Sequence, residues 1–361
     1  MNTQLFLCLT FAGLVACGSS SSTDVGSGSP PAPASVGPHA NGTLADWQSL
    51  GEMPTPRGNL CAVAANNWLV VIGGNYKPKG KSDFVTTAEI HAARLNPDGT
   101  VGAWQLAGKT PSPVSSCTAA ADGKTVILLD GIYDDDTAAR QIHATTIGDD
   151  GMLAPWRDIG ALPDGARVLY SQASLTKNVL RAFDAKLPDS GDAVVVLTTK
   201  LGADGNVTTW DETVSFAGFR GHPQYAFADA YVYALGGYAS SSKDNAVLTD
   251  GAGASITGAG STFNVAALPK ATAFGQAVAV DDYVFVVGGK DEVMSGKGRA
   301  DAFAAKIGDA GGLAEWATAA SLPQGRTAHA LVAAGNYLYV VGGGYDGGGL
   351  ASVFSAQVRF E

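Results

Sequence analysis

Three arginines stand at equivalent positions of a pattern that recurs along the chain. Arg57, Arg220 and Arg326 each lie three residues after a position that most copies fill with proline. A guanidinium group is a planar donor that can hold a carboxylate or sulfate with two parallel hydrogen bonds. We therefore take these arginines as candidate ligand-binding residues around a central channel. The alternative, which we favour, is a structural role in which each arginine donates to backbone carbonyl groups and bridges neighbouring repeats.

Other polar residues give weaker indications of chemistry. The run Asp134–Asp135–Asp136 lacks the alternating oxygens of an EF-hand loop, so we expect a hydrated acidic turn. His91 and His143 occupy a position that other copies fill with leucine or phenylalanine, which predicts core residues rather than ligands. No HExxH, Gly-x-Ser-x-Gly, P-loop or CxxC motif is present. The sequence therefore predicts no catalytic residue, metal site or cofactor.

Two cysteines lie near the starts of neighbouring repeats. An even number of cysteines outside the cytoplasm suggests a disulfide. Cys61 lies seven residues after Pro54, however, whereas Cys117 lies six residues after Pro111. Because strand side chains alternate between two faces, this offset predicts that the sulfur atoms point to opposite faces. We therefore expect both cysteines to be buried and unpaired.

The elements that would position these residues are six repeats of about fifty residues. Each repeat has a bulky aromatic residue with a glycine five residues before it, and the aromatics recur at intervals of 52 to 57 residues. The aromatics are Trp47, Trp104, Trp156, Trp210, Phe263 and Trp316. In four repeats an apolar run ends in a Gly-Gly pair, at residues 73–74, 236–237, 288–289 and 342–343. The third repeat has Ala182 and Phe183 there and has lost the signature.

Each repeat contains four short stretches that are typical of β-strands. The stretches follow the proline position, end in Gly-Gly, precede the turn glycine and carry the aromatic residue. A unit of this length with four strands is typical of a propeller blade. The Gly-Gly pair, the downstream Trp and the Leu-Pro-x-x-Arg segment, clearest in residues 322–343, resemble the kelch repeat. This resemblance covers residues 41–361 and implies an all-β, six-bladed kelch-type β-propeller with four antiparallel strands per blade.

The count of strands also predicts how the ring closes. The last repeat lacks its fourth strand, and residues 42–47 supply a fourth-strand pattern ahead of the first complete repeat. We expect this N-terminal strand to pair with residues 352–358 in the last blade. Such pairing would remove an exposed sheet edge and lock the ring.

The N-terminus carries a targeting signal. The apolar run at residues 5–16 is too short to span a bilayer and is typical of a secretory signal peptide, residues 1–16. It ends in Leu14-Val15-Ala16-Cys17, which resembles the lipobox of bacterial lipoproteins. The resemblance implies a lipid on Cys17 and, with Gly18 next, the outer membrane. The alternative is an ordinary secretory signal that happens to contain Cys17. Residues 17–40 are rich in Ser, Gly, Pro and Ala, which predicts a flexible tether.

Charge and loop variety bear on the kind of partner. The net charge of −10 would repel a phosphate backbone, so a nucleic acid partner is excluded. The loops after the Gly-Gly positions differ in length and charge, as binding loops on a uniform scaffold do. They comprise residues 75–87, 132–140, 238–245, 290–299 and 344–350. We expect a non-enzymatic binding module, anchored to the cell envelope, whose loops engage a protein or glycan ligand.

Two other classes of function stay open. Kelch-like propellers include enzymes, and the six-bladed sialic acid mutarotase shares the blade number expected here. That resemblance would imply a carbohydrate-active enzyme that uses the channel arginines with an acid such as Glu52, by analogy of fold alone. A purely structural envelope protein is the third possibility.

Overall fold

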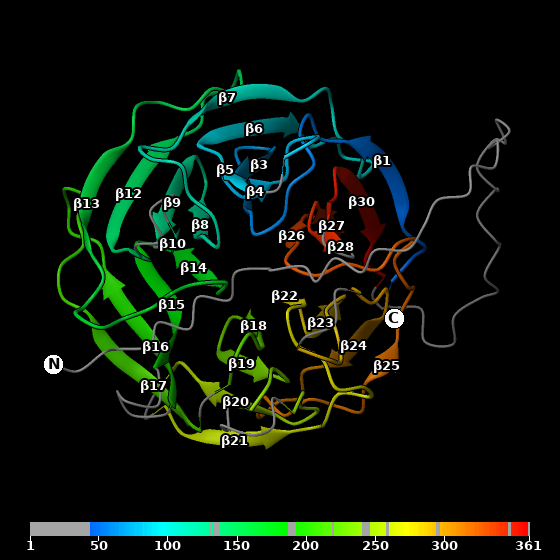
Figure 1. The fold of residues 1–361 in the computed structure, drawn as a ribbon. Helices are drawn as coiled ribbons and strands as arrows, with labels where there is room; N and C mark the ends of the chain where they lie inside the picture. The colour runs from blue at the N-terminus through cyan, green and yellow to red at the C-terminus, as the bar shows by residue number, and fades with distance from the viewer. Residues whose placement is uncertain are drawn as a thin grey trace, which may run out of the picture. The chain divides into compact units, whose positions relative to one another are not determined.

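The propeller consists of β-strands arranged in a ring (Figure 1). The computed structural model describes residues 44–81, 83–129, 131–132, 138–186, 193–218, 220–239, 246–257, 260–293, 297–345 and 348–359. These residues contain no helix, and so none of the length and apolar character needed to cross a membrane. Six four-stranded sheets surround one axis, which confirms the predicted six-bladed β-propeller.

The six sheets share one antiparallel order, listed from the channel outwards. Blade 1 consists of β2 (Cys61–Ala65), β3 (Trp68–Ile72), β6 (Glu89–Arg94) and β7 (Gln105–Lys109). Blade 2 consists of β8 (Thr118–Asp122), β9 (Thr125–Leu129), β12 (Gln141–Thr146) and β13 (Arg157–Ala161). Blade 3 consists of β14 (Ala173–Thr176), β15 (Val179–Lys186), β16 (Ala193–Lys200) and β17 (Asp211–Ala217). Blade 4 consists of β18 (Gln224–Phe227), β19 (Tyr231–Leu235), β20 (Gly251–Ser255) and β21 (Thr262–Val265). Blade 5 consists of β22 (Gln276–Val280), β23 (Tyr283–Val287), β24 (Ala302–Lys306) and β25 (Ala317–Thr318). Blade 6 consists of β26 (Ala330–Ala334), β27 (Tyr337–Val341), β30 (Ser352–Gln357) and β1 (Gln48–Glu52).

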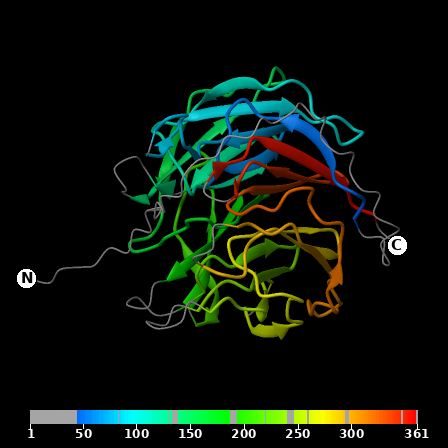
Figure 2. The same cartoon turned by 45° about the vertical axis from the view of Figure 1, so that its right-hand side comes forward.

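An N-terminal strand closes the ring, as the strand count predicts, but it comprises Gln48–Glu52, directly after the predicted residues 42–47. Strand β1 pairs antiparallel with β30, with Gln48 opposite Ser355 and Glu52 opposite Ser352. Figure 2 shows this blue strand lying along the red C-terminal strand. Blade 6 is therefore built from both ends of the propeller sequence, and its outer edge strand is supplied by residues that precede blade 1.

The repeated tryptophans join neighbouring blades. Trp47, Trp104, Trp156, Trp210 and Trp316 each lie directly before an outermost strand, whereas Phe263 lies within β21. Four of the indole groups donate to a backbone oxygen near the end of the preceding blade's outer strand. These bonds are Trp47 to Ala320, Trp156 to Lys109, Trp210 to Ala161 and Trp316 to Ala266, at 2.7 to 3.0 Å. In these four cases the indole hydrogen bond ties a blade to the sheet before it.

The Gly-Gly pairs end the second strands because both residues adopt positive φ. In blade 6 the φ angles are 58° at Gly342 and 105° at Gly343, in the region that favours glycine. A Cβ on Gly342 would lie 2.7 Å from the Arg57 backbone oxygen, so a larger residue would also clash. Where Ala182 and Phe183 replace the pair, β15 does not end but continues to Lys186. The loss of the signature thus explains the long β15–β16 hairpin of blade 3.

The cores lie between adjacent blades. One cluster joins Ile127 and Leu129 of blade 2 to Leu180 and Val195 of blade 3, all nearly inaccessible to solvent. Another joins Phe285 of blade 5 to side chains of blade 6. Each sheet therefore packs one face on the sheet before it and the other face on the sheet after it.

This face-to-face packing overturns the expectation that Cys61 and Cys117 are unpaired. The two cysteines form a disulfide, with their Cα atoms 5.6 Å apart. Both belong to the core cluster between blades 1 and 2. The prediction was wrong because the strands that carry the cysteines lie in different sheets. Opposite faces of two adjacent blades point toward each other, so the one-residue offset brings the sulfur atoms together.

Candidate functional site

The three candidate arginines occupy the same structural position in their blades. In each, Nη1 donates to the first glycine oxygen of the blade's own Gly-Gly pair: Arg57 to Gly73 at 3.0 Å, Arg220 to Gly236 at 3.0 Å and Arg326 to Gly342 at 2.8 Å. The same nitrogen also donates to a backbone oxygen at or just before the third strand, namely Glu89, Asp250 or Ser352. Each side chain therefore ties the second and third strands of one blade together.

Arg57 and Arg326 are withdrawn from solvent. Both side chains have 0% exposure. Burial lowers the pKa of both guanidinium groups, that of Arg326 to about 10. The second nitrogen of Arg57 donates to His91 Nδ1 at 2.7 Å, and that of Arg326 donates to Ser352 Oγ at 3.0 Å. This arrangement is the one expected of structural arginines.

Arg220 and Glu52 have different surroundings. Arg220 also forms a salt bridge with the Asp250 carboxylate, and this contact lowers the pKa of Asp250. Glu52 ends the outermost strand of blade 6, where its side chain is exposed. The structure therefore places the proposed acid on an outer edge strand and gives Arg220 an acidic partner from its own blade.

The two histidines of the repeated third strand are only partly alike. His91 is buried, as expected, and accepts the hydrogen bond from Arg57 on Nδ1. Burial and the adjacent Arg57 charge lower the pKa of His91, so its ring stays neutral near pH 7. His143 is half-buried, and burial lowers its pKa as well. The acidic run at residues 134–136 lies outside the described residues.

The mouth of the channel is built from one residue of each blade, just before the innermost strand. All six residues have positive φ between 46° and 59°, although none is glycine. They are Asn59, Ser116, Tyr170, His222, Phe274 and Ala328. Their backbones form five links of a hydrogen-bonded ring around the axis, each from the N–H of one residue to the oxygen of its counterpart in the preceding blade, at 2.7 to 3.2 Å. We call these six the mouth residues.

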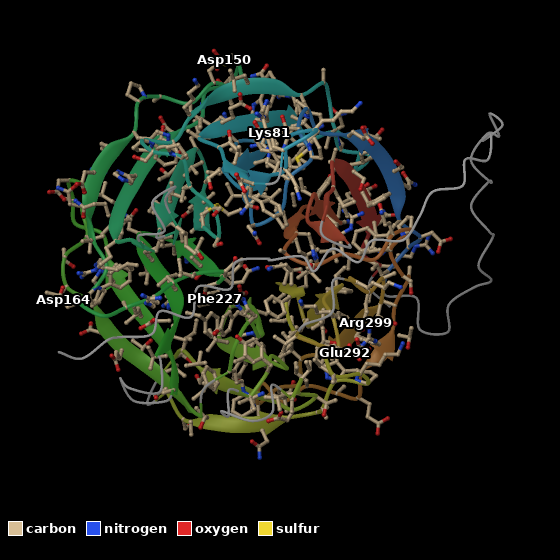
Figure 3. All side chains as sticks on the ribbon, viewed as in Figure 1. Lys81, Asp150, Asp164, Phe227, Glu292 and Arg299 are labelled. Carbon is tan, nitrogen blue, oxygen red and sulfur yellow. A yellow bond between two sulfur atoms is a disulfide. The ribbon has the colours of Figure 1, made fainter. Side chains whose placement is uncertain are left out.

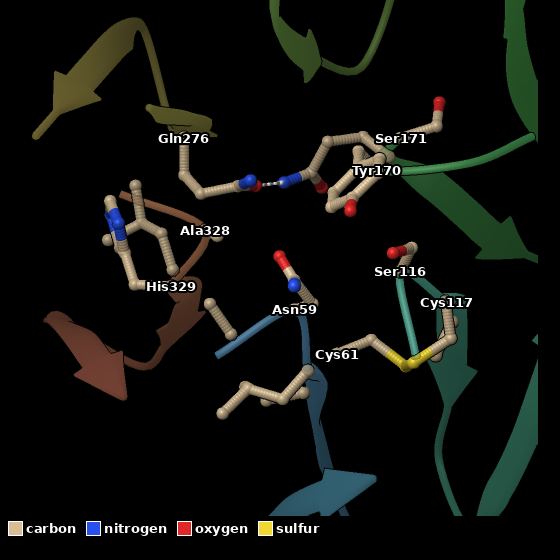
Figure 4. Close-up of a pocket in the computed structure, with 15 residues that line it drawn as sticks. Asn59, Cys61, Ser116, Cys117, Tyr170, Ser171, Gln276, Ala328 and His329 are labelled. Carbon is tan, nitrogen blue, oxygen red and sulfur yellow. Dashed lines mark hydrogen bonds between the residues drawn. A yellow bond between two sulfur atoms is a disulfide. The ribbon is translucent and has the colours of Figure 1, made fainter. Parts of the chain in front are cut away.

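A polar pocket of about 50 Å³ lies at this mouth (Figure 4). Its fifteen lining residues include Asn59, Ser116, Tyr170, Gln172 and Gln276, and none of the fifteen is Asp, Glu, Lys or Arg. Gln172 Nε2 donates to Gln276 Oε1 at 3.0 Å, which joins the residue directly before β14 of blade 3 to the first residue of β22 of blade 5. The Cys61–Cys117 disulfide forms part of the wall. The pocket is therefore lined by uncharged groups: amides, hydroxyls, the His329 ring, which burial keeps neutral, and apolar side chains such as Leu60 and Leu331.

Three consecutive blades place aromatic rings at the mouth. Tyr170 contacts His222 edge to face, with ring centroids 4.6 Å apart, and His222 stacks on Phe274 at 4.1 Å. Lys290 Nζ lies 4.4 Å from the centroid of Phe274. Burial and the nearby Lys290 charge lower the pKa of His222 to about 4. The other three mouth residues, Asn59, Ser116 and Ala328, are small. The mouth thus has an aromatic half and a small, polar half.

No motif in the sequence marks these residues as a site. A signal was present in the spacing, because Gln172, Gln224 and Gln276 recur at intervals of 52 residues, two positions after a mouth residue. Gln224 is buried within blade 4, whereas Gln172 and Gln276 meet in the pocket. Periodicity therefore identifies the position, but not which copies face the channel.

The loops after the Gly-Gly positions carry small hairpins in three consecutive blades. These are β28–β29 (Gly344–Tyr345, Gly348–Gly349) in blade 6, β4–β5 (Asn75–Tyr76, Val85–Thr86) in blade 1 and β10–β11 (Gly131–Ile132, Ala138–Ala139) in blade 2. Phe84 and Val85 of the second hairpin are each 42% exposed. Figure 3 shows Lys81 of this loop over the first sheet, whereas Asp150 and Asp164 lie at the rim.

The turn-glycine hairpins at the other ends of the strands contact neighbouring blades. Tyr233 Oη donates to the Gly311 oxygen at 2.8 Å, and Arg157 Nη2 donates to the Gly205 oxygen at 3.0 Å. Asn66 Nδ2 donates to the Gly148 oxygen at 3.1 Å. These hairpins therefore help to hold the ring together.

The predicted lipidation site Cys17 and the tether lie outside the described residues, so the structure adds nothing about them. Within the described residues no three His, Cys, Asp or Glu side chains gather as metal ligands. No family model matches the sequence, and no curated protein matches it.

Proposed function

We propose that the chain is a non-enzymatic binding module, anchored to the bacterial cell envelope, which engages its partner on the face that carries the Gly-Gly loops and the channel mouth. The observation that carries the proposal is the difference between the two faces. On one face the hairpins donate to or accept from neighbouring blades. On the other, hairpins rise from three consecutive blades, and that of blade 1 presents two exposed apolar side chains, Phe84 and Val85. Large exposed apolar side chains grouped on loops are typical of interaction surfaces.

The anchor rests on the sequence. The lipobox-like tetrapeptide ending in Cys17 and the tether after it support a lipidated protein, and Gly18 supports the outer membrane. The Cys61–Cys117 disulfide supports an oxidising compartment outside the cytoplasm. The kelch-like pattern of Gly-Gly pairs supports membership of the kelch-type propellers.

The binding module accounts better for the arginines than a mutarotase-like enzyme does. Such an enzyme would use channel arginines with an acid. Arg57 and Arg326 instead donate to backbone oxygens and have no exposed surface. Glu52 lies exposed on the outermost strand of its blade.

Retention on isolated envelopes of the native host tests which face binds. The full chain with Cys17→Ser would be added, so that no lipid contributes, and the bound fraction measured. Phe84→Glu with Val85→Glu changes the Gly-Gly face, and Leu106→Glu with Met152→Glu is the matched control, at 48% and 46% exposure. We expect the first pair to abolish retention and the control to keep it. Equal retention of both variants would contradict the proposal.

The anchor has its own test. In cells grown with an alkyne-labelled palmitate, the wild-type chain should acquire the label and sediment with membranes. Cys17→Ser should lose the label and appear in the soluble fraction, whereas Cys8→Ser should behave as wild type. Label on Cys17→Ser, or none on the wild-type chain, would show that Cys17 is not the lipid anchor.

A further inference from the structure

The channel mouth combines three features that together describe a ligand. Its pocket is lined by amide, hydroxyl and apolar groups and by the imidazole of His329, which burial keeps neutral, and by no carboxylate, ammonium or guanidinium group. One wall is an aromatic ring, Tyr170, and the volume of about 50 Å³ admits a single small substituent rather than a whole ring. The ligand that suits this site is uncharged, has a flat apolar face, and carries one polar substituent that enters the pocket.

The aromatic wall is held rigidly. The Tyr170 and His222 rings contact each other edge to face, and the His222 ring stacks on Phe274. The Lys290 ammonium lies over the Phe274 ring. The three rings belong to blades 3, 4 and 5, so their positions are fixed by three different sheets. A preorganised aromatic surface loses little side-chain entropy when a ligand stacks on it.

All six mouth residues have the left-handed backbone conformation, whose strain only glycine would avoid. Tyr170, His222 and Phe274 have φ angles of 50°, 46° and 59°. Tyrosine and phenylalanine rarely adopt this conformation, and such outliers concentrate at functional sites. The equivalent positions in the other blades have Asn59, Ser116 and Ala328, so the architecture accepts smaller side chains there. The aromatic choice in three consecutive blades is therefore a property of the mouth and not a requirement of the propeller.

The polar wall can donate and accept. Gln172 and Gln276 share one hydrogen bond, which engages one donor of the first amide and the oxygen of the second. Each amide retains further hydrogen-bonding capacity, since an amide has two donors and an acceptor oxygen with two lone pairs. Asn59 and Ser116 add an amide and a hydroxyl to the same pocket (Figure 4). Amides and hydroxyls recognise hydroxyl and acetamido groups without favouring a charge.

We infer that the mouth binds one unit of a neutral saccharide. The pyranose ring stacks on Tyr170 through its C–H groups, which the negative face of an aromatic ring attracts. A hydroxymethyl or acetamido substituent enters the pocket and bonds to the amides of Gln172 and Gln276. The inference deepens the proposed function by giving the chemical class of a ligand on the same face. It does not involve Arg57, Arg220 or Arg326, so an acidic sugar has no advantage.

Titration calorimetry of the full chain tests the ligand class. The probes are N,N′-diacetylchitobiose, which is neutral, chitobiose, which is a dication, and N-acetylneuraminic acid, which is an anion. We expect the neutral probe to bind and the charged probes to bind at least about tenfold more weakly. Absence of binding by the neutral probe, or tighter binding by either charged probe, would overturn the inference. If envelope retention persists in that case, the proposed function stands without it.

Variants locate the binding. Tyr170→Ala should weaken the neutral probe by roughly tenfold, the loss of a stacking contact, whereas Tyr170→Phe should leave its affinity unchanged. Gln276→Leu is the second variant, should Tyr170→Ala fail to fold, and it should also weaken binding. Leu106→Ala is the control, since this exposed side chain lies on the outermost strand of blade 1, outside the pocket. Undiminished binding by both Tyr170→Ala and Gln276→Leu would overturn the assignment to the mouth.

Discussion

The indole nitrogen of Trp47 donates to the backbone oxygen of Ala320 at 2.7 Å, across 273 residues of sequence. Trp47 precedes the strand that completes blade 6, and Ala320 follows the outermost strand of blade 5. Trp156 makes the same bond to Lys109 between blades 2 and 1, which follow each other in the chain. The last junction of the ring is therefore built like an internal junction.

Substitution of Trp47 should weaken the ring in proportion to what is removed. Trp47→Phe leaves the Ala320 oxygen without its donor, and we expect a loss of about 1–2 kcal/mol in the free energy of unfolding. Trp47→Ala also leaves a cavity and should cost about 3–5 kcal/mol. Urea unfolding measures both. Trp156→Phe is the matched control, and a loss there with none at Trp47 would mean that the N-terminal strand does not secure the ring.

Replacement of the buried Arg326 should lower the free energy of unfolding of the propeller. Arg326→Ala deprives the oxygens of Gly342 and Ser352 of a charged donor, so we expect a loss of about 3 kcal/mol or more. Arg326→Lys keeps the charge but cannot donate to both oxygens in the same geometry, and should recover only part of the loss.

Arg94 provides the comparison for Arg326. This side chain is exposed and donates to the Asp149 oxygen at 3.3 Å. Arg94→Ala should change the free energy of unfolding by less than about 1 kcal/mol. If Arg326→Ala were as stable as Arg94→Ala, the buried arginine would not be structural, and a ligand-binding role would become the better explanation.

The disulfide should stabilise the junction between blades 1 and 2. Cys61 and Cys117 are 56 residues apart, a separation for which loop-closure entropy gives about 4 kcal/mol. The double variant Cys61→Ala with Cys117→Ala should therefore unfold at lower urea concentration than the oxidised wild type. Non-reducing peptide mapping should recover the two cysteines in one linked fragment. Two free thiols at these positions would show that the bond does not form.

Stability should fall as the solution is acidified below neutrality. His329 is 1% exposed, and burial, with the nearby Arg326 charge, lowers its pKa to about 3. The unfolded chain, with an ordinary histidine pKa near 6.5, binds this proton first, so stability is complete above that pH and declines below it. Between pH 7.5 and pH 5 the loss should approach about 2 kcal/mol.

The variant His329→Leu isolates that contribution. The described residues give neither ring nitrogen of His329 a hydrogen-bond partner, so leucine removes no bond found there. Urea midpoints at the two pH values should therefore differ less for this variant than for the wild type. An identical pH dependence in both proteins would show that His329 is not the residue that couples stability to pH.

The repeats made most of the fold predictable. Gly-Gly pairs, turn glycines and aromatics mark the same points in successive copies, and the missing fourth strand of the last copy predicts the pairing of β1 with β30. Even the departure at Ala182 and Phe183 corresponds to a structural change, the extension of β15. These features are local, because each depends on the backbone conformation of one or two residues.

The site depended on relations between blades, which a single-sequence pattern does not contain. The Cys61–Cys117 prediction failed because it compared two strands as if they shared a sheet. The arginines are equivalent in sequence, but only the structure shows whether their guanidinium groups meet carbonyl oxygens or solvent. Tyr170 and Gln276 meet at the pocket because the ring brings blades 3 and 5 toward one axis. Nothing in the spacing of those residues indicates which of their groups face the channel.

The most direct test of the account is where the partner contacts the propeller in living cells of the native host. A photo-crosslinking amino acid would be placed at Asn59, Phe84 or Gly348 on the face of the mouth and loops, and at Asp98, Asp150 or Asp204 in the opposite hairpins. Adducts with an envelope component should form from the first set and be absent from the second. Adducts that form only from Asp98, Asp150 and Asp204 would contradict the account.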